Sequence, residues 1–226
     1  MGSVERTTNT PRRVVITGLG VVTPLGTGVG PTWQALSQGQ SGVDIIRSFD
    51  ASAYPCKIAA EVKDFDPLDY VDKKDVKRMD RFTQFAIASA SMAMADAGLK
   101  FDEQQAQRMG CLLGVGLGGM ATFERNHESL LHAGPQRISP FFVPMLIGNM
   151  AAGQVCMHFG LRGPNLCVST ACAAGTHAIG EAYKIIQRGD ADVMLTGGSE
   201  AAVTPLGLGG FCALRALSTR NDAPQQ

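Results

Sequence analysis

Short apolar runs alternate along the chain with longer segments of helical character. β-branched residues packed together before a glycine turn predict a buried first strand at residues 13–20. Similar runs predict further strands at residues 110–115, 166–170 and 193–196. Proline near a start and glycine past an end are the helix signals, and they predict helices at residues 31–38, 81–97, 120–131 and 173–188. This alternation indicates an α/β fold.

The most informative unit spans residues 166–196, which predict a strand, a helix and a second strand. One face of the helix carries four apolar side chains at i, i+3, i+4 and i+7 spacing. These are Ile179, Ala182, Tyr183 and Ile186. We therefore expect a β-α-β unit with parallel strands and a right-handed crossover.

Three other segments have distinct patterns. Residues 62–81 mix charges of both signs, which is typical of a solvated surface. Pro140 and Pro144 bracket a stretch that we expect to be extended. Residues 145–159 are apolar nearly all round and end at a glycine, so this segment is expected to be buried or to lie at a subunit interface.

The composition supports a folded domain. The chain has 226 residues and is 45% hydrophobic, which is enough apolar material for a core and excludes a natively disordered protein. Only the polar tail, residues 1–12, is expected to be disordered, ahead of one domain at residues 13–226. Twenty Lys and Arg balance twenty Asp and Glu. Because there is no basic excess, we expect neither nucleic acid nor a membrane as a partner.

The lack of a secretory pattern and the arrangement of the cysteines both indicate one compartment. The start of the chain is polar and has no secretory pattern, and no later segment approaches the length of a membrane span. Six cysteines are scattered without any C-x-x-C pair. We expect a cytoplasmic protein in which most of these cysteines are buried small hydrophobic residues.

Two motifs resemble a dinucleotide site and a zinc site, but each lacks a feature that such a site requires. Glycine is over-represented, with 27 residues, and residues 114–119 satisfy the G-x-G-x-x-G pattern of a dinucleotide site. The acidic ribose partner is missing from residues 134–149, so we expect a tight turn and no cofactor. His127 and His132 resemble part of a zinc-protease motif, but their five-residue spacing takes them off a common helix face. We expect no metal.

Cys172 is the strongest candidate for chemistry. It lies at the junction of a predicted strand and a predicted helix, as a nucleophile does at a sharp elbow, and backbone N–H groups at the helix start favour a thiolate. Small neighbours leave room for an acyl group, and N–H groups can stabilise the oxyanion of a tetrahedral intermediate. The alternative is a buried structural cysteine in a tight turn. His177 faces away from Cys172 on the helix and is expected to be structural.

Five motifs occur in order along the chain. They are RVVITGLG at 13–20, GLGG at 116–119, ISPFFVP at 138–144, STACAAG at 169–175 and RALSTRND at 215–222. In sequence, order and spacing they resemble the β-ketoacyl-[acyl-carrier-protein] synthases, and most closely the elongating synthase II of fatty-acid biosynthesis. The resemblance runs from about residue 12 to the end of the chain.

The resemblance implies a fold, partners and residue roles. The fold would be thiolase-like, with two similar α/β halves, and this chain would supply the N-terminal half, a mixed and mostly parallel sheet covered by helices. The partners would be a second copy, in a homodimer, and acyl carrier protein carrying an acyl or a malonyl group. Cys172 would take the acyl chain as a thioester, which the carbanion from decarboxylated malonyl-carrier protein then attacks. Leu117 matches a position that gates the acyl pocket and Phe142 one that enters the partner's pocket, although both also suit core apolar residues.

One departure from the resembled family affects activity. Its members carry two catalytic histidines and a lysine in a second half, and none of the four histidines in this sequence lies in a matching motif. We therefore expect this chain alone to hold a reactive cysteine but not to decarboxylate malonyl-carrier protein. Two alternatives stay open: a polyketide ketosynthase fragment, and a non-catalytic module for dimerisation or carrier-protein binding.

Overall fold

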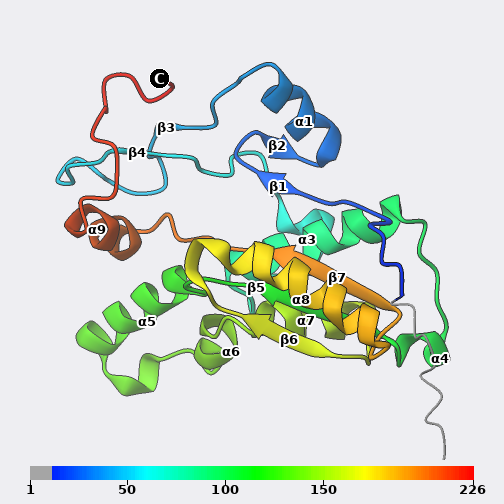
Figure 1. Cartoon of the computed structure of the whole chain (residues 1–226). Helices are drawn as coiled ribbons and strands as arrows, with labels where there is room; N and C mark the ends of the chain where they lie inside the picture. Colours follow the sequence, from blue (N-terminus) through cyan, green and yellow to red (C-terminus); the bar gives the residue numbers. More distant parts are fainter. Residues whose placement is uncertain (1–11) are drawn as a thin grey trace, which may run out of the picture.

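A three-stranded parallel sheet lies at the centre of the computed structural model, which describes residues 12–226 (Figure 1). Its strands, in spatial order, are β6 (Asn165–Val168), β5 (Met109–Gly114) and β7 (Val193–Gly198). Helix α8 (Ala174–Arg188) covers one face, while α7 (Met150–Phe159) and α3 (Arg81–Asp96) cover the other (Figure 1). The chain therefore has three layers, as an α/β sequence pattern predicts.

Strand β5 is the centre of the core. Side chains at alternate positions, including Cys111 and Leu113, enter the cluster formed with α3 and α7. Leu112 points the other way, into the cluster with Ala178 and Ile185 of α8. All six residues of β5 are buried, which explains why its sequence is continuously apolar rather than alternating.

The β-α-β prediction is confirmed in its parallel strands and corrected in its details. Strands β6 and β7 both run parallel to β5, which lies between them, so α8 passes over an intervening strand. Of the four apolar side chains predicted on one face of the helix, only Ala182 is fully buried, and Ile179 is 49% exposed. The handedness of the crossover stays a prediction.

Small residues explain this correction. The buried face of α8 consists of Ala174, Ala178, Ala182 and Ile185. A Cβ added at Gly114 of β5 would overlap the backbone of Ala174, so helix and strand are nearly in contact where the helix begins. Alanines allow this close approach, and the bulkier Ile179 and Tyr183 lie on the flank of the helix.

The strand predicted at residues 13–20 is wrong. These residues have no strand partner among the described residues, and Ile16 is 78% exposed. The segment lies instead along α3, where a Cβ at Gly18 or Gly20 would overlap the helix backbone. β-branched residues favour an extended chain, but a strand also needs a neighbouring edge to satisfy its N–H and C=O groups.

Most helix predictions are confirmed. The helices predicted at 31–38, 81–97 and 120–131 correspond to α1 (Val29–Ser37), α3 and α5 (Met120–Ala133), with ends within two residues. The apolar segment 145–159 contains α7, which ends at Gly160 in the left-handed region. One face of α7 is buried, with Ala151, Ala152, Val155 and Cys156, while Met157 is 63% exposed.

Two segment predictions need correction. The stretch between Pro140 and Pro144 is not extended, because α6 (Phe142–Leu146) contains Pro144. That proline is in the first turn, where its missing N–H costs no intrahelical hydrogen bond. The charged segment 62–81 is solvated only in part: Val71 and Met79 are buried against the core, and the charged Asp80 is buried as well.

The remaining elements form the periphery of the domain. A second small core, with Ile46, Cys56 and Leu208, joins the β3–β4 pair to α9. The peripheral elements are β1 (Val22–Thr23), β2 (Gly26–Thr27), β3 (Asp44–Ile45), β4 (Ile58–Ala59), η1 (Pro67–Asp69), α2 (Lys73–Val76), α4 (Glu103–Ala106), η2 (Pro135–Arg137) and α9 (Pro205–Ala213). Of the tail predicted at residues 1–12, all but Arg12 lies outside the described residues. Among residues 12–226, no helix has the length and hydrophobicity to span a membrane.

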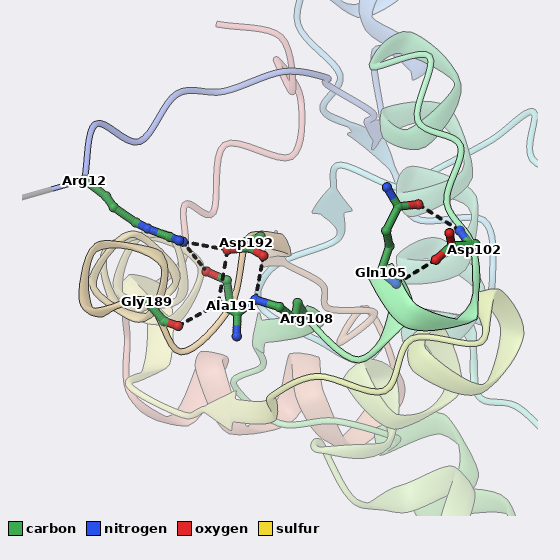
Figure 2. Close-up of polar contacts among 7 residues, drawn as sticks. All are labelled: Arg12, Asp102, Gln105, Arg108, Gly189, Ala191 and Asp192. Carbon is green, nitrogen blue, oxygen red and sulfur yellow. Dashed lines mark hydrogen bonds and ion pairs between the residues drawn. The ribbon is translucent and has the colours of Figure 1, made fainter.

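An ion-pair cluster ties the amino ends of β5 and β7 together (Figure 2). Arg108, just before β5, donates to both carboxylate oxygens of Asp192, just before β7, at 2.5 and 3.1 Å. Arg12 donates to the same carboxylate at 2.6 Å. Figure 2 also shows a capping box between Asp102 and Gln105, which starts α4 shortly before Arg108. These bonds lie at the end of the sheet opposite to Cys172.

Removing the Asp192 charge is expected to weaken the fold slightly in a pH-dependent way. Hydrogen bonds from Arg108 and Arg12 hold the pKa of the Asp192 carboxyl well below its usual value of 3.8. The stabilisation is therefore present above 3.8 and is lost as the pH falls through the lowered value in the folded state. Because the pair is exposed, Asp192→Asn is expected to cost less than about 1 kcal/mol at pH 7. Urea unfolding of the wild type and of Asp192→Asn from pH 7 to pH 2 tests this. A difference in unfolding free energy between the two that grows as the pH falls would contradict it.

Candidate active site

Cys172 lies in a sharp turn between the end of β6 and the start of α8. The turn is a single 3₁₀ element, η3 (Ala171–Ala173), and the Cys172 side chain is exposed. Ala171 has φ of 51°, in the left-handed region that residues with a side chain rarely adopt. This strained backbone turns the chain so that the thiol lies outside the sheet, at the start of a 15-residue helix.

The helix start offers donors beside the thiol. Ala173, the residue before α8, makes no side-chain capping hydrogen bond, so no side chain occupies the first N–H groups of α8, of which that of Ala174 donates to the Ala171 oxygen. Such groups can bind an anion, including the oxyanion formed when a thiolate adds to a carbonyl. The arrangement suits nucleophilic acyl transfer.

Glycines bring the carboxyl ends of the strands together at this point. A Cβ at Gly175, in the first turn of α8, would lie 3.1 Å from the Cα of Gly198 at the end of β7. Gly114, at the end of β5, packs against the same turn. Side chains at these positions would push α8 away from the sheet, so the glycines fix where Cys172 sits.

The glycine turn after β5 binds a carboxylate of the protein itself. The backbone N–H groups of Gly116, Leu117 and Gly118 donate to the two carboxylate oxygens of Glu200, at 2.8, 2.7 and 3.1 Å. Successive N–H groups that point to one anion are the arrangement that cradles phosphate in dinucleotide sites. Here the cradle is filled by Glu200, which agrees with the expectation that no dinucleotide binds.

Leu117 lies beside the Cys172 turn. Ser169 Oγ donates to the carbonyl oxygen of Gly116 at 3.4 Å, and a Cβ at Gly116 would lie 4.0 Å from the Ala171 oxygen. Leu117 is the next residue and its side chain is 47% exposed. The structure therefore brings the Leu117 loop and the Cys172 turn together.

Phe142 is linked to this region less directly. It is the first residue of α6 and is half-buried. The other end of α6 packs on the glycine turn, since Gly119 N donates to the Leu146 oxygen at 2.9 Å. Leu146 is four positions after Phe142 in the helix, a rise of about 6 Å.

The far side of the glycine turn is anchored by a buried carboxylate. Asp80, before α3, accepts from the N–H and the hydroxyl of Thr122 at 3.0 and 2.6 Å. Thr122 lies in the first turn of α5, directly after the glycine turn. The turn is thus held at both ends by packed secondary structure.

The histidines have no direct role at the thiol. His177 Nδ1 shares a hydrogen bond with Thr170 Oγ1 at 2.7 Å, so it braces the backbone before the turn, as a structural histidine would. His158 packs edge-on against Phe159 of α7. His127 and His132 line an open groove between α5 and α9. Within residues 12–226, no histidine is hydrogen-bonded to Cys172, and no cluster of three or more metal-ligating side chains occurs.

The other cysteines differ from Cys172 in burial. All six are free thiols, and only Cys172 is exposed. A hydrogen bond with Cys156, together with burial, raises the pKa of the Cys111 thiol, and burial raises that of Cys167. Cys111 and Cys167 are therefore poor nucleophiles, and Cys172 is singled out among the six thiols by its exposure to solvent.

Comparison with known proteins agrees with this geometry. The profile of the family described as "Beta-ketoacyl synthase, N-terminal domain" matches residues 11–225. The chain belongs to the β-ketoacyl synthase family. One curated relative, "3-oxoacyl-[acyl-carrier-protein] synthase 2" of Coxiella burnetii, is 54% identical over 215 residues. The alignment covers 95% of this chain and 52% of the relative, so the present β-ketoacyl synthase chain spans about half the length of the relatives it matches.

Solved structures give the same result. A β-ketoacyl synthase from Burkholderia phymatum superimposes with a TM-score of 0.83 at 32% identity, covering 94% of this chain and 52% of that one. A chain from a structure described as a "type II PKS acyl-carrier protein in complex with its ketosynthase bound to the hexaketide" gives a TM-score of 0.77 at 26% identity, covering 90% and 55%. These neighbours are thiolase-like ketosynthases, so the predicted fold class is confirmed.

Sequence reasoning about this β-ketoacyl synthase missed Glu200. The sequence does contain a signal for it. A glycine turn leaves several N–H groups without partners, and the Glu200 carboxylate follows β7, the second strand along the chain after that turn. The carboxyl ends of parallel strands meet at one edge of a sheet, so a carboxylate there can reach the turn. The contact joins residues more than 80 positions apart, which periodicity cannot reveal.

Proposed function

We propose that the protein is a 3-oxoacyl-[acyl-carrier-protein] synthase of fatty-acid biosynthesis in which Cys172 is the nucleophile. The observation that carries the proposal is the exposed Cys172 thiol on a strained turn at the start of α8. The name and the 54% identity of the relative from Coxiella burnetii support the reaction class. A second curated relative of the same name, from Staphylococcus aureus, is 52% identical, and these two names favour fatty acids over polyketides.

The first half-reaction is acyl transfer. The Cys172 thiolate adds to the carbonyl carbon of an acyl thioester on acyl carrier protein, and N–H groups near the start of α8 stabilise the oxyanion. The intermediate collapses with cleavage of the bond to the carrier sulfur, which leaves as a thiolate and takes up a proton. The acyl chain is now a thioester of Cys172.

The second half-reaction forms the carbon–carbon bond. Malonyl-carrier protein loses carbon dioxide, and the resulting carbanion attacks the Cys172 thioester, which releases the Cys172 thiolate and a 3-oxoacyl chain two carbons longer. Groups that would stabilise the carbanion are not found beside Cys172 among the described residues. We assign them to the part of the relatives' length that this chain does not span.

Leu117 and Phe142 are proposed to shape the acyl pocket. The exposed side chain of Leu117, on a loop that adjoins the Cys172 turn, suits a gate for the acyl chain. Phe142, at the outer end of α6, suits a contribution to the pocket of a second subunit. The second role requires a homodimer.

A homodimer is supported by the free edge of β6. Among residues 12–226 this strand pairs with β5 on one side only, and its Leu166 side chain is 49% exposed. An open strand edge with apolar side chains readily pairs with another chain. Acyl carrier protein is the proposed second partner, and the cytoplasm, where six free thiols are stable, is the proposed compartment.

The proposal is tested by comparing two acyl donors. The chain is mixed with octanoyl-acyl carrier protein or with octanoyl-pantetheine, and the acylated chain is quantified by intact mass. We expect transfer from both donors and at least about tenfold faster transfer from the carrier protein. Equal rates would contradict carrier-protein recognition. Carrier binding without any transfer would instead support the non-catalytic module.

A further inference from the structure

Glu200 is held in an unusual way for an exposed carboxylate. Its oxygens accept three consecutive backbone N–H groups, from Gly116, Leu117 and Gly118. A Cβ at Gly116 would lie 2.6 Å from Glu200 Oε2, so the carboxylate packs directly on the loop backbone. Charge-assisted bonds of this kind are roughly twice as strong as neutral ones.

The backbone that carries Glu200 is fixed to the rest of the fold. Ser199 N donates to the Gly114 oxygen at 3.0 Å, which extends the pairing of β7 with β5. Ser199 Oγ donates to the Phe82 oxygen of α3 at 2.6 Å. The carboxylate therefore projects from a rigid position at the end of the sheet.

The same loop also contacts the nucleophile turn. Ser169 Oγ donates to the Gly116 oxygen at 3.4 Å, and Ala171, the strained residue before Cys172, adjoins Gly116. The loop backbone thus makes hydrogen bonds both to Glu200 and to Ser169, which precedes the turn that carries Cys172. Movement of the loop would change the position of Leu117 relative to the thiol.

We propose that Glu200 is a positioning residue for acyl transfer to Cys172. Its carboxylate fixes the backbone of residues 116–118, so that Leu117 and the adjoining peptide groups hold the acyl chain in line with the thiol. Without the carboxylate, three N–H groups lose their acceptor and the loop relaxes. The inference rests on the proposed function, because it concerns acyl delivery to the same thiol.

Glu200→Ala is the main test, with Glu124→Ala as the matched control. Glu124 also accepts a backbone N–H, from Leu206 at 2.8 Å, but at the start of α9. We expect Glu200→Ala to slow octanoyl transfer to Cys172 by about 10- to 100-fold, since small misplacements of reacting groups cost rates of this order. Alkylation of Cys172 by iodoacetamide, which needs no acyl positioning, is expected to change less than about threefold. Glu124→Ala is expected to leave both rates unchanged.

Chemical rescue separates positioning from general destabilisation. Added acetate can occupy the vacated N–H groups, so it is expected to restore octanoyl transfer in Glu200→Ala and to have no effect on Glu124→Ala. Chloride at the same ionic strength is the salt control. Glu200→Gln, which keeps the side-chain volume but places an NH₂ group against the donors, is expected to lie between Glu200→Ala and the wild type.

The outcomes distinguish the inference from the function on which it rests. Octanoyl transfer at the wild-type rate in Glu200→Ala overturns the inference and leaves the proposed function intact. An equal loss of octanoyl transfer and iodoacetamide alkylation, without rescue by acetate, also overturns it, because the role is then merely structural. If Glu200→Ala does not fold, an unchanged rate in Glu200→Gln overturns it. Failure of the wild type to accept the octanoyl group contradicts the proposed function instead.

Discussion

Replacing Cys172 with serine is expected to slow octanoyl transfer to the chain by at least about 10³-fold. A serine hydroxyl stays protonated near neutral pH unless a base removes its proton, and within the described residues no histidine is hydrogen-bonded to Cys172. The N–H groups at the start of α8 remain in place, but they stabilise an oxyanion only after a nucleophile has attacked. The rate is measured by intact mass with octanoyl-acyl carrier protein as the donor.

The matched control for this substitution is Cys212→Ser. Cys212 is a free, half-buried thiol in α9, away from the strand ends where Cys172 lies. The Cys212 variant is expected to acylate at the wild-type rate. Since Cys172 is exposed, Cys172→Ser should unfold in urea at the wild-type midpoint. Acyl transfer by Cys172→Ser within about tenfold of the wild type would contradict the nucleophile assignment.

Replacing Gly114 with alanine is expected to destabilise the fold by about 3 kcal/mol. The new Cβ would overlap the backbone of Ala174, in the first turn of α8. Neither partner can move alone, because Gly114 belongs to the buried central strand and Ala174 to the helix that covers it. The helix start must shift, and the Cys172 turn just before it must shift as well.

Gly180→Ala is the control for Gly114→Ala. Gly180 lies within α8 and a Cβ there would meet no atom within 4 Å. This substitution is expected to stabilise the protein by about 0.5–1 kcal/mol, since alanine favours a helix more than glycine does. Urea unfolding measures both. A cost below about 1 kcal/mol for Gly114→Ala would show that α8 is less tightly packed on β5 than the structure indicates.

Local signals in the sequence predicted the central part of the fold. The continuous apolar run of β5 and the glycines that end α7 and α8 are signals within a few residues of the element that they define. The strand expected at residues 13–20 is wrong because its sequence favours an extended chain but does not specify a partner edge. The extended stretch predicted between Pro140 and Pro144 is wrong because the free-energy cost of proline depends on its position in a helix, which the sequence alone does not fix.

The candidate site was predictable in part for the same reason. The junction of a predicted strand and a predicted helix at Cys172 indicated an elbow, and the structure has that turn. The left-handed conformation of Ala171 was not predictable, since alanine rarely adopts it and only the surrounding packing enforces it. Glu200 depends on the meeting of two strand ends that are far apart in sequence.

The central claim is that Cys172 is the acyl-accepting nucleophile, and mapping the acyl group in the octanoyl-carrier reaction tests it most directly. The wild-type chain is treated with less than one equivalent of octanoyl-acyl carrier protein, digested at low pH and analysed by tandem mass spectrometry. The account predicts the octanoyl group on the Cys172 peptide and on none of the five other cysteines. An octanoyl group on another cysteine, or spread evenly among them, would contradict it.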